Sequence, residues 1–135
     1  MFDTKFVIVV REDLAQWQKL NVTAFLATGV AGAEEGLLGE DYRDGAGNVY
    51  RPLCAQPIIV LGGDSDTLKK VHTRALERGV PAALYIEEMF STGHDAANRA
   101  VFAEFSPENA KVVGIAFRAE KKIADKITKG AKMHP

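Results

Sequence analysis

The sequence predicts a single three-layer α/β domain, residues 1–135, in which a mostly parallel central sheet of about four strands has helices on both faces. Apolar runs of strand length alternate along the chain with stretches of helical periodicity. Such alternation is typical of parallel sheets that are covered by helices. A length of 135 residues is that of one domain. A small hairpin is expected in addition to the sheet.

Four apolar runs have the length and composition of strands. The first, KFVIVV at 5–10, is an unbroken apolar run after its lysine, which predicts burial on both faces and a central position. The other strands are expected at 58–61, 82–86 and 111–117. The hairpin is expected where two glycine-containing turn pairs, DG and GN, separate YR from VYRPL.

The segments between these strands have the spacing of helices. WQKLNVTAFLATGVAG, from residue 17, is apolar around most of its surface, so we expect that helix to be mostly buried. A second helix begins in DSDT, where Asp64 or Asp66 can cap it, and ends at Gly79. Asp95 is placed to cap a third helix. AEKKIADKITKG, from residue 119, predicts a short closing helix.

Composition and charge indicate a globular protein. The hydrophobic share is 47%, and no apolar run approaches the roughly 18 residues that span a bilayer, so we expect a cytoplasmic protein without a membrane partner. The net charge is −1, but residues 111–135 contain seven Lys or Arg against two acids. A nucleic-acid backbone would favour such a basic end, although a solvated helix face is the preferred interpretation.

Metal and cofactor sites are not expected. His72, His94 and His134 lack the spacing of metal ligands, and Cys54 has no histidine near it in sequence that would activate it. We interpret Cys54 as a small packed thiol. The glycine pair at 62–63 lacks the lysine and the spacing of a Walker motif.

The loops at the carboxyl ends of parallel strands are where such sheets bind ligands. That rule selects residues 11–19, 62–66 and 87–98. The last loop and the helix after it hold the polar candidates Thr92, His94, Asp95, Asn98 and Arg99.

Each of these candidates also has a structural interpretation. His94 and Asp95 can form a base with its orienting acid, but we favour Asp95 as a helix cap. Arg99 can contact an anionic ligand near the helix start or form a salt bridge. Asn21, an amide in an apolar helix, must bond to a neighbouring loop or to a ligand, and we favour the loop slightly.

The order of segments and several motifs resemble the type-two peptidyl-tRNA hydrolase fold, and more closely a bacterial family of unassigned function that shares it. The resemblance runs from Lys5 to Met133. KFVIVVREDL is similar to the first strand and its exit, and WQKLNVTAFLA falls on a Gly-Lys-x-Ala-x-Gln helix start. RALERGVPAALYI falls on a helix, a Gly-Leu-Pro turn and a strand, and VVGIAFRAEKKIADKITKGAKM is similar to the last strand and helix.

The resemblance implies a hydrolase-like site. Lys19 occupies the position of the lysine at the helix start, Glu87 falls near the strand-end aspartate, and Thr23 falls near the helix glutamine. An ammonium beside Glu87 would keep that carboxylate ionised and able to accept a proton from water, whereas a rim ion pair is the simpler interpretation. The short turn that follows the aspartate in the hydrolases is replaced here by EMFSTGHDAANRAVF.

Three functions therefore stay open. The first is binding of a small polar or anionic ligand in a cleft at the strand ends, with Lys19 and Glu87 as the catalytic pair if chemistry occurs. The ligand-binding residues would be Asn21, Thr23, Thr92, His94, Asp95, Asn98 and Arg99. The second is peptidyl-tRNA hydrolysis, with tRNA on the basic closing helix. The third is a non-catalytic homodimeric interaction domain.

Overall fold

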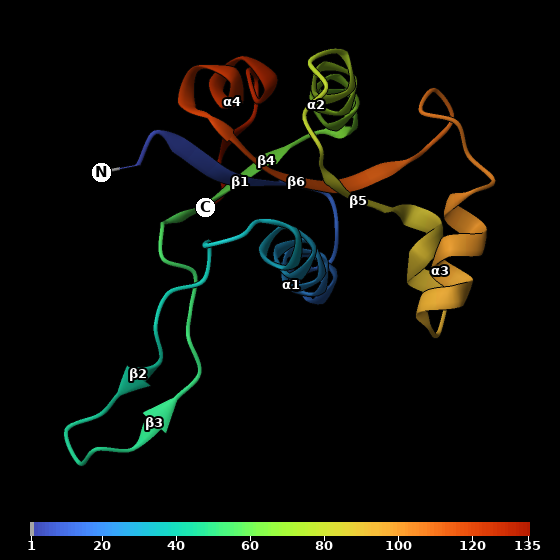
Figure 1. The fold of residues 1–135 in the computed structure, drawn as a ribbon. Coiled ribbons are helices and arrows are strands. Elements are labelled where there is room, and N and C mark those ends of the chain that lie inside the picture. The colour runs from blue at the N-terminus through green and yellow to red at the C-terminus, as the bar shows by residue number, and fades with distance from the viewer. Residues whose placement is uncertain (1) are drawn as a thin grey trace.

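The computed structural model describes residues 2–135 and contains a five-stranded sheet with helices on both faces (Figure 1). The strand order is β5-β6-β1-β4-β7. The strands are β1 (Thr4–Arg11), β4 (Ile58–Gly63), β5 (Ala83–Ile86), β6 (Val112–Glu120) and β7 (Lys132–Met133).

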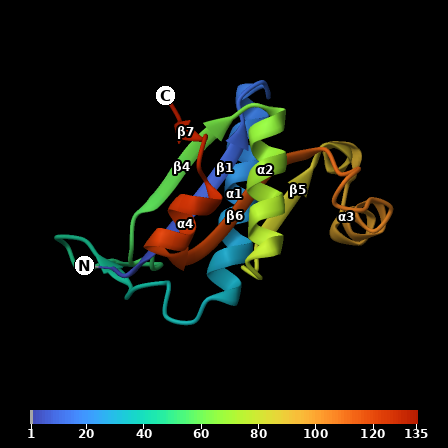
Figure 2. The ribbon, with the colours of Figure 1, turned by 90° about the horizontal axis from the view of Figure 1, so that it is seen from above.

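Three helices cover the sheet, and one lies outside it. Helix α1 (Gln16–Ala33) covers one face, and α2 (Ser65–Glu77) and α4 (Lys121–Ile127) cover the other. Beyond β5 the chain forms a short 3-10 helix, η1 (Glu87–Ser91), and then α3 (Asp95–Phe102), which covers neither face (Figure 2). Helix α2 is capped by Asp64, whose carboxylate accepts a hydrogen bond from the Thr67 amide at 2.8 Å.

The prediction of a mostly parallel sheet of about four strands is wrong. Only β1 and β4 pair in parallel, whereas β6 is antiparallel to both β1 and β5, and β7 is antiparallel to β4. The reason lies in the connection from β5 to β6. The Glu87 amide donates to the Lys111 carbonyl oxygen at 2.9 Å, so the chain leaves β5 and begins β6 at the same edge of the sheet. Because α3 does not cross a face of the sheet, β6 runs back antiparallel.

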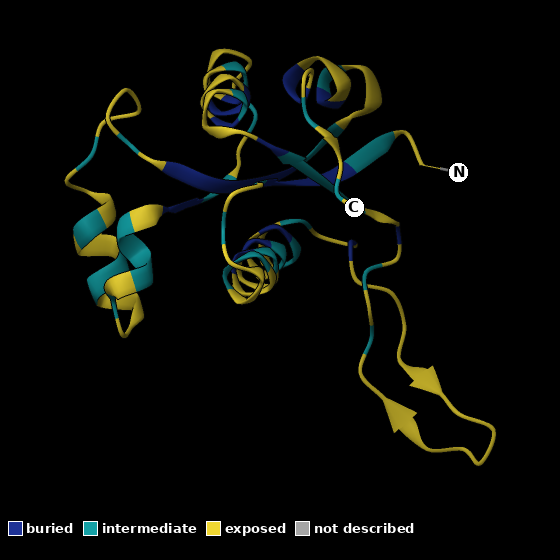
Figure 3. Cartoon of the chain, turned by 180° about the vertical axis from the view of Figure 1, so that it is seen from behind, coloured by how far each residue is buried: buried dark blue, intermediate teal, exposed yellow. Residues whose placement is uncertain are grey.

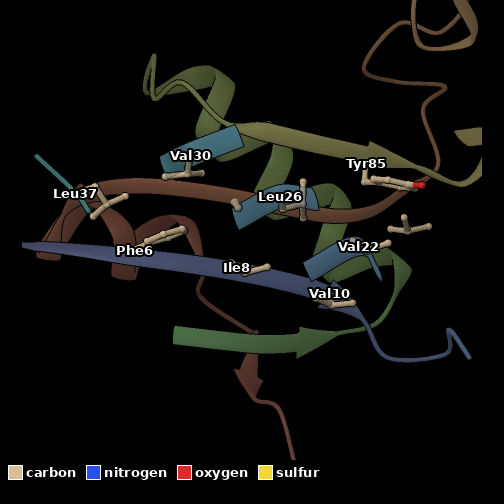
Figure 4. Close-up of a cluster of buried hydrophobic side chains, with 10 residues drawn as sticks. Phe6, Ile8, Val10, Val22, Leu26, Val30, Leu37 and Tyr85 are labelled. Atoms are coloured by element: carbon tan, nitrogen blue, oxygen red, sulfur yellow. The ribbon is translucent and has the colours of Figure 1, made fainter. Parts of the chain in front are cut away.

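Strand β1 is central, as its unbroken apolar run predicted. Phe6, Ile8 and Val10 belong to the core cluster under α1, which Figure 4 shows in close-up. Val7 and Val9 belong to the cluster under α2 and α4. The side chains therefore alternate between two separate cores, one on each face of the sheet.

The expectation that α1 is mostly buried is wrong. Val22, Leu26 and Val30 are its buried residues, whereas Trp17 and Leu20 are exposed. Only the sheet side of α1 has a partner layer, and its outer side is largely exposed in Figure 3. The apolar surface that surrounds this helix is therefore only partly used by the core of the chain.

Gly114 sets how closely α1 approaches β6. A Cβ atom added there would lie 2.5 Å from Val22 Cγ1 and 2.8 Å from Leu26 Cδ1. Both side chains are buried, and separations below 3.0 Å require one of the contacting groups to shift. The missing side chain at this position therefore allows the α1 face of the core to close.

We predict that Gly114→Ala lowers the free energy of unfolding by about 1–3 kcal/mol, because overpacking displaces α1 from the sheet. The measurement is urea denaturation followed by circular dichroism. Gly32→Ala is the matched control, since nothing lies within 4 Å of a Cβ atom at that helical position. That control should be neutral or stabilising by up to about 1 kcal/mol. Equal stability of the Gly114 variant and the wild type would contradict the prediction.

The predicted hairpin is present as β2 (Tyr42–Arg43) paired antiparallel with β3 (Val49–Tyr50). Asp44 organises its tip. One carboxylate oxygen accepts from the amides of Ala46 and Asn48 at 2.9 Å each, and the other accepts from the Asn48 side chain and the Tyr50 hydroxyl at 2.9 Å each. Hydrogen bonds from Asn48, followed by that from Tyr50, lower the pKa of Asp44 to about 2.

We predict that the tip keeps its structure down to low pH. Because the pKa of Asp44 is lowered, its stabilising effect is fully present above the ordinary carboxyl pKa of about 4 and is lost as the pH falls through about 2. NMR titration of the Asp44 carboxyl carbon and the Asn48 amide measures this. A carboxyl midpoint near 4 would contradict the network, and Asp44→Ala should free both amides at neutral pH.

Candidate functional site

Strands β1, β4 and β5 run in the same direction, although only two of them are neighbours. Strand β4 is parallel to β1, and β5 is antiparallel to β6, which is itself antiparallel to β1. Their carboxyl ends therefore lie at one edge of the sheet, as the sequence argument assumed. At that edge Arg11 donates from a terminal guanidinium nitrogen to Glu87 at 3.0 Å and from Nε to Asp13 at 2.5 Å.

The ion partner of Glu87 is thus Arg11. Within residues 2–135 the ammonium of Lys19 takes part in no ion pair. The Thr23 hydroxyl donates a hydrogen bond to the Lys19 carbonyl oxygen at 2.7 Å, within α1. Thr23 does not line either of the cavities described below. Catalysis by Lys19 and Glu87 stays a prediction.

A cleft between α1 and the η1–α3 segment gathers most of the predicted ligand-binding residues. It consists of a cavity of about 240 Å³ and an adjoining one of about 550 Å³, which share Tyr85, Met89 and Asn98. We call this the α1–α3 cleft. The predicted residues that line it are Asn21, Thr92, His94, Asp95, Asn98 and Arg99. The side chain of Asn21 is exposed and makes no hydrogen bond to residues 2–135, so the expected loop partner is not found.

Four aromatic rings form the apolar wall of the cleft, and sequence analysis missed them. Trp17 meets Phe90 edge-on with ring centroids 6.0 Å apart, Phe90 lies 5.2 Å from Tyr85, and Tyr85 lies 6.1 Å from Phe25. The sequence contained part of the pattern that predicts this wall, because Trp17, Asn21 and Phe25 are spaced four residues apart and so lie on one stripe of α1. Phe90 joins them only through the path of the chain after β5.

Tyr85 is the most buried polar side chain of the cleft. It is 6% exposed, and burial raises the pKa of its phenol, which is therefore neutral at physiological pH. Its hydroxyl makes no hydrogen bond within residues 2–135, and it is not sealed from solvent. Figure 4 shows Tyr85 at the end of the cluster that is formed by Val22 and Leu26. A phenol whose ring is buried and whose hydroxyl is free of protein partners is well placed to bind a polar atom of a ligand.

The polar residues of η1 and α3 surround the opening. His94 caps α3, because its Nδ1 accepts from the Ala97 amide at 3.1 Å, so the prediction of Asp95 as the cap is wrong. Asp95 is the first residue of α3 and pairs with Arg99 at 2.8 Å. The Thr92 hydroxyl donates to the Met89 carbonyl oxygen at 2.8 Å and contacts the side-chain amide of Asn98. Loop hydrogen bonds therefore hold Asn98 in place.

The basic end of the chain lies away from this cleft. Helix α4 carries Lys121, Lys122 and Lys126 and covers the opposite face of the sheet from α1. The single acid of this helix, Asp125, pairs with Lys5 at 2.6 Å. Contact of this helix with tRNA stays a prediction.

The part of the chain that the structure describes contains neither a metal-binding cluster nor a membrane-spanning helix. Within residues 2–135 no three His, Cys, Asp or Glu side chains gather as a metal-binding set. In the same span no helix combines the length and the apolar character that crossing a membrane requires.

Comparisons with known proteins place the chain in a group without an assigned activity. A family model described as a protein of unknown function, DUF2000, matches residues 4–135. A solved structure of a protein of unknown function from Agrobacterium tumefaciens strain C58 is 62% identical, with a TM-score of 0.98 and full coverage of both chains. No match was found among curated proteins. Neither match supports the resemblance to peptidyl-tRNA hydrolases.

Proposed function

The chain belongs to the DUF2000 family of unknown function, and we propose that it binds a small, uncharged, planar molecule in the α1–α3 cleft. The single observation that carries this proposal is the hydroxyl of Tyr85, which has no partner within residues 2–135 and belongs to a buried ring that lies beside those of Phe25 and Phe90. Ligand sites are typically apolar cavities that contain a few convergent polar groups. The cleft has this composition.

The wall of the cleft favours a flat ring. Phe25, Tyr85 and Phe90 present faces and edges against which a ring can stack at ordinary centroid distances. The Tyr85 hydroxyl and the amides of Asn21 and Asn98 can then bond to polar atoms on the edge of that ring.

Charge in the cleft disfavours an anion. Arg99 is the one Lys or Arg residue that lines either cavity, and its guanidinium is paired with Asp95 at 2.8 Å. Binding of an anion would require that this pair separate or that the ligand lie beside the Asp95 carboxylate. We therefore narrow the expected small polar or anionic ligand to an uncharged one.

Trp17 is the only tryptophan of the chain and lines the cleft, so its fluorescence reports occupancy. We predict that at least one of four probes, namely adenosine, uridine, nicotinamide and indole-3-carboxamide, shifts or quenches Trp17 emission in a saturable way. Tyr85→Phe should weaken that binding about fivefold, because it removes one buried hydrogen bond and leaves the ring.

Tyr42→Phe is the matched control, since Tyr42 is exposed on the hairpin outside the cleft. It should leave the affinity unchanged. The proposal fails if none of the probes alters Trp17 emission up to millimolar concentration, or if Tyr85→Phe binds the probe as well as the wild type. Isothermal titration calorimetry checks the affinities independently.

We propose homodimerisation as a second function, because the hairpin is an unsupported arm. Residues 38–51 are all exposed, and the hairpin extends away from the body on the side of the sheet where α1 lies (Figure 3). A lone two-stranded hairpin is marginal in water without further packing. The arm, residues 38–53, carries the exposed apolar side chains Leu38, Tyr42, Val49, Tyr50 and Leu53.

The occupant that we propose for these apolar surfaces is a second copy of the chain. Helix α1 offers an apolar ridge at Leu20 and Ala24, which are exposed on the flank that is turned away from the cleft, whereas Ala27 and Ala31 on that flank pack partly against the core of the same chain. In a dimer the arms would bury ten large side chains, five from each copy, that are now about half exposed. The surface buried by these side chains would be roughly 1,000 Å², which is near the lower limit for a specific interface. A two-fold axis would let each arm lie on the ridge of its partner.

We predict that the wild type sediments as a concentration-dependent dimer. Two variants should each shift it to monomer, namely Leu20→Glu and the double variant that combines Tyr42→Ser with Val49→Ser. A buried charge or a lost apolar contact at the interface causes this shift. Leu76→Glu is the matched control, because Leu76 is equally apolar, 55% exposed and on α2 across the sheet. A wild type that stays monomeric at 100 μM, or variants that remain dimeric, would refute the arm interface.

A further inference from the structure

A second cavity, of about 350 Å³, lies on the other face of the sheet between α2, β5 and the segment that follows α3. Helix α2 contributes His72 and Leu76, β5 contributes Leu84 and Ile86, and Phe102 and Phe105 close the far side. We call it the α2 cavity. It shares Leu84 and Phe102 with the α1–α3 cleft, whereas Tyr85, which belongs to the core under α1, lines that cleft only.

The cavity has a deep floor and an open rim. Ile86 is fully buried at the floor, whereas Leu76 is 55% and Phe102 39% exposed at the rim. Every lining side chain except one is Ala, Val, Leu, Ile, Pro or Phe. An apolar hollow of this depth, left open to solvent, is where a small apolar molecule gains most from leaving water.

The exception is His72, which is 8% exposed. Burial lowers the pKa of its imidazole, and no hydrogen bond or charged group contributes to that shift. Within residues 2–135 its ring makes no hydrogen bond, and its nitrogens are not sealed from solvent. A neutral imidazole has one N–H donor and one acceptor nitrogen, and both can bond to a polar group of a molecule that enters the cavity.

We propose that the α2 cavity is a binding site for an uncharged apolar molecule that carries a single hydroxyl group, which bonds to His72. The hydroxyl supplies the missing partner of the imidazole, and the remainder of the molecule fills the apolar hollow. An ionised group is excluded from the occupant because no charged side chain lines the cavity to replace its hydration. The volume suits roughly ten non-hydrogen atoms, at about 30 Å³ for each water-sized unit.

The test uses two probes of nearly the same shape, 4-ethylphenol and ethylbenzene, which differ by one hydroxyl. Binding is followed by NMR through the imidazole signal of His72 and by calorimetry. The wild type should bind 4-ethylphenol saturably, about fivefold more tightly than ethylbenzene, because only the phenol bonds to His72. His72→Leu should remove this preference while still binding both probes.

Two further variants locate the site. Ala82→Phe places a ring in the lining at an exposed position and should abolish binding of both probes. Tyr85→Phe alters the α1–α3 cleft alone and should leave 4-ethylphenol binding unchanged. Thermal unfolding by circular dichroism verifies that each variant is folded.

The proposal is overturned by any of three results. The first is that neither probe perturbs the imidazole signal of His72 up to the solubility limit of the probe. The second is that His72→Leu keeps the preference for the phenol. The third is that Ala82→Phe binds the probes as the wild type does. A response confined to Trp17 fluorescence would assign the probe to the α1–α3 cleft and would equally refute the α2 cavity as its site.

Discussion

The antiparallel insertion of β6 between β1 and β5 is the constraint on which the rest of the structure depends. Because β6 pairs with β1, two neighbouring strands form the buried centre of the sheet, and each is apolar on both faces. Both cores form around this pair of strands. It also leaves β5 with a neighbour on one side only. The η1–α3 segment is consequently held beyond the sheet by the short return from Ile86 to Val112 and does not cover a face.

That position of β5 contributes to two hollows, the α1–α3 cleft and the α2 cavity. A strand with helices stacked directly over both faces would have its side chains packed, as Val7 and Val9 are. Beside β5, α1 and α2 cover only part of each face, and α3 stands apart from both helices. Tyr85 therefore lines the α1–α3 cleft and Ile86 the α2 cavity, while Leu84 on the same short strand lines both.

The two hollows share a chemical character that differs from that of the predicted catalytic edge. At the edge, the Arg11 side chain, which is 14% exposed, is ion-paired with the more exposed carboxylates of Asp13 and Glu87. Each hollow instead holds one neutral, deeply buried side chain, a phenol or an imidazole, without a partner in the chain. Charge is expensive in such surroundings and a matched hydrogen bond is favourable, so both hollows select uncharged ligands.

Local patterns in the sequence determined much of this protein. The unbroken run at 5–10 required burial on both faces, the turn pairs at 44–48 specified a hairpin, and Gly79, with a φ of 63°, ended α2 where a left-handed residue was needed. Asn21 and Asn98, two of the predicted ligand-binding residues, line one cleft, but ligand binding by them stays a prediction, and Tyr85 was not among the predicted residues.

Strand direction, the cap of α3 and the aromatic wall of the cleft were decided only by the tertiary structure. A strand has the same apolar pattern whichever way it runs, so nothing in KVVGIAF distinguishes a crossover from a return beside β5. His94 replaced Asp95 as the cap because the path of the loop, not residue preference, selects which side chain reaches the Ala97 amide. Phe90 and Trp17 are far apart along the chain and meet only when β5 ends beside α1, because ring contacts depend on distance in space and leave no periodic trace in sequence.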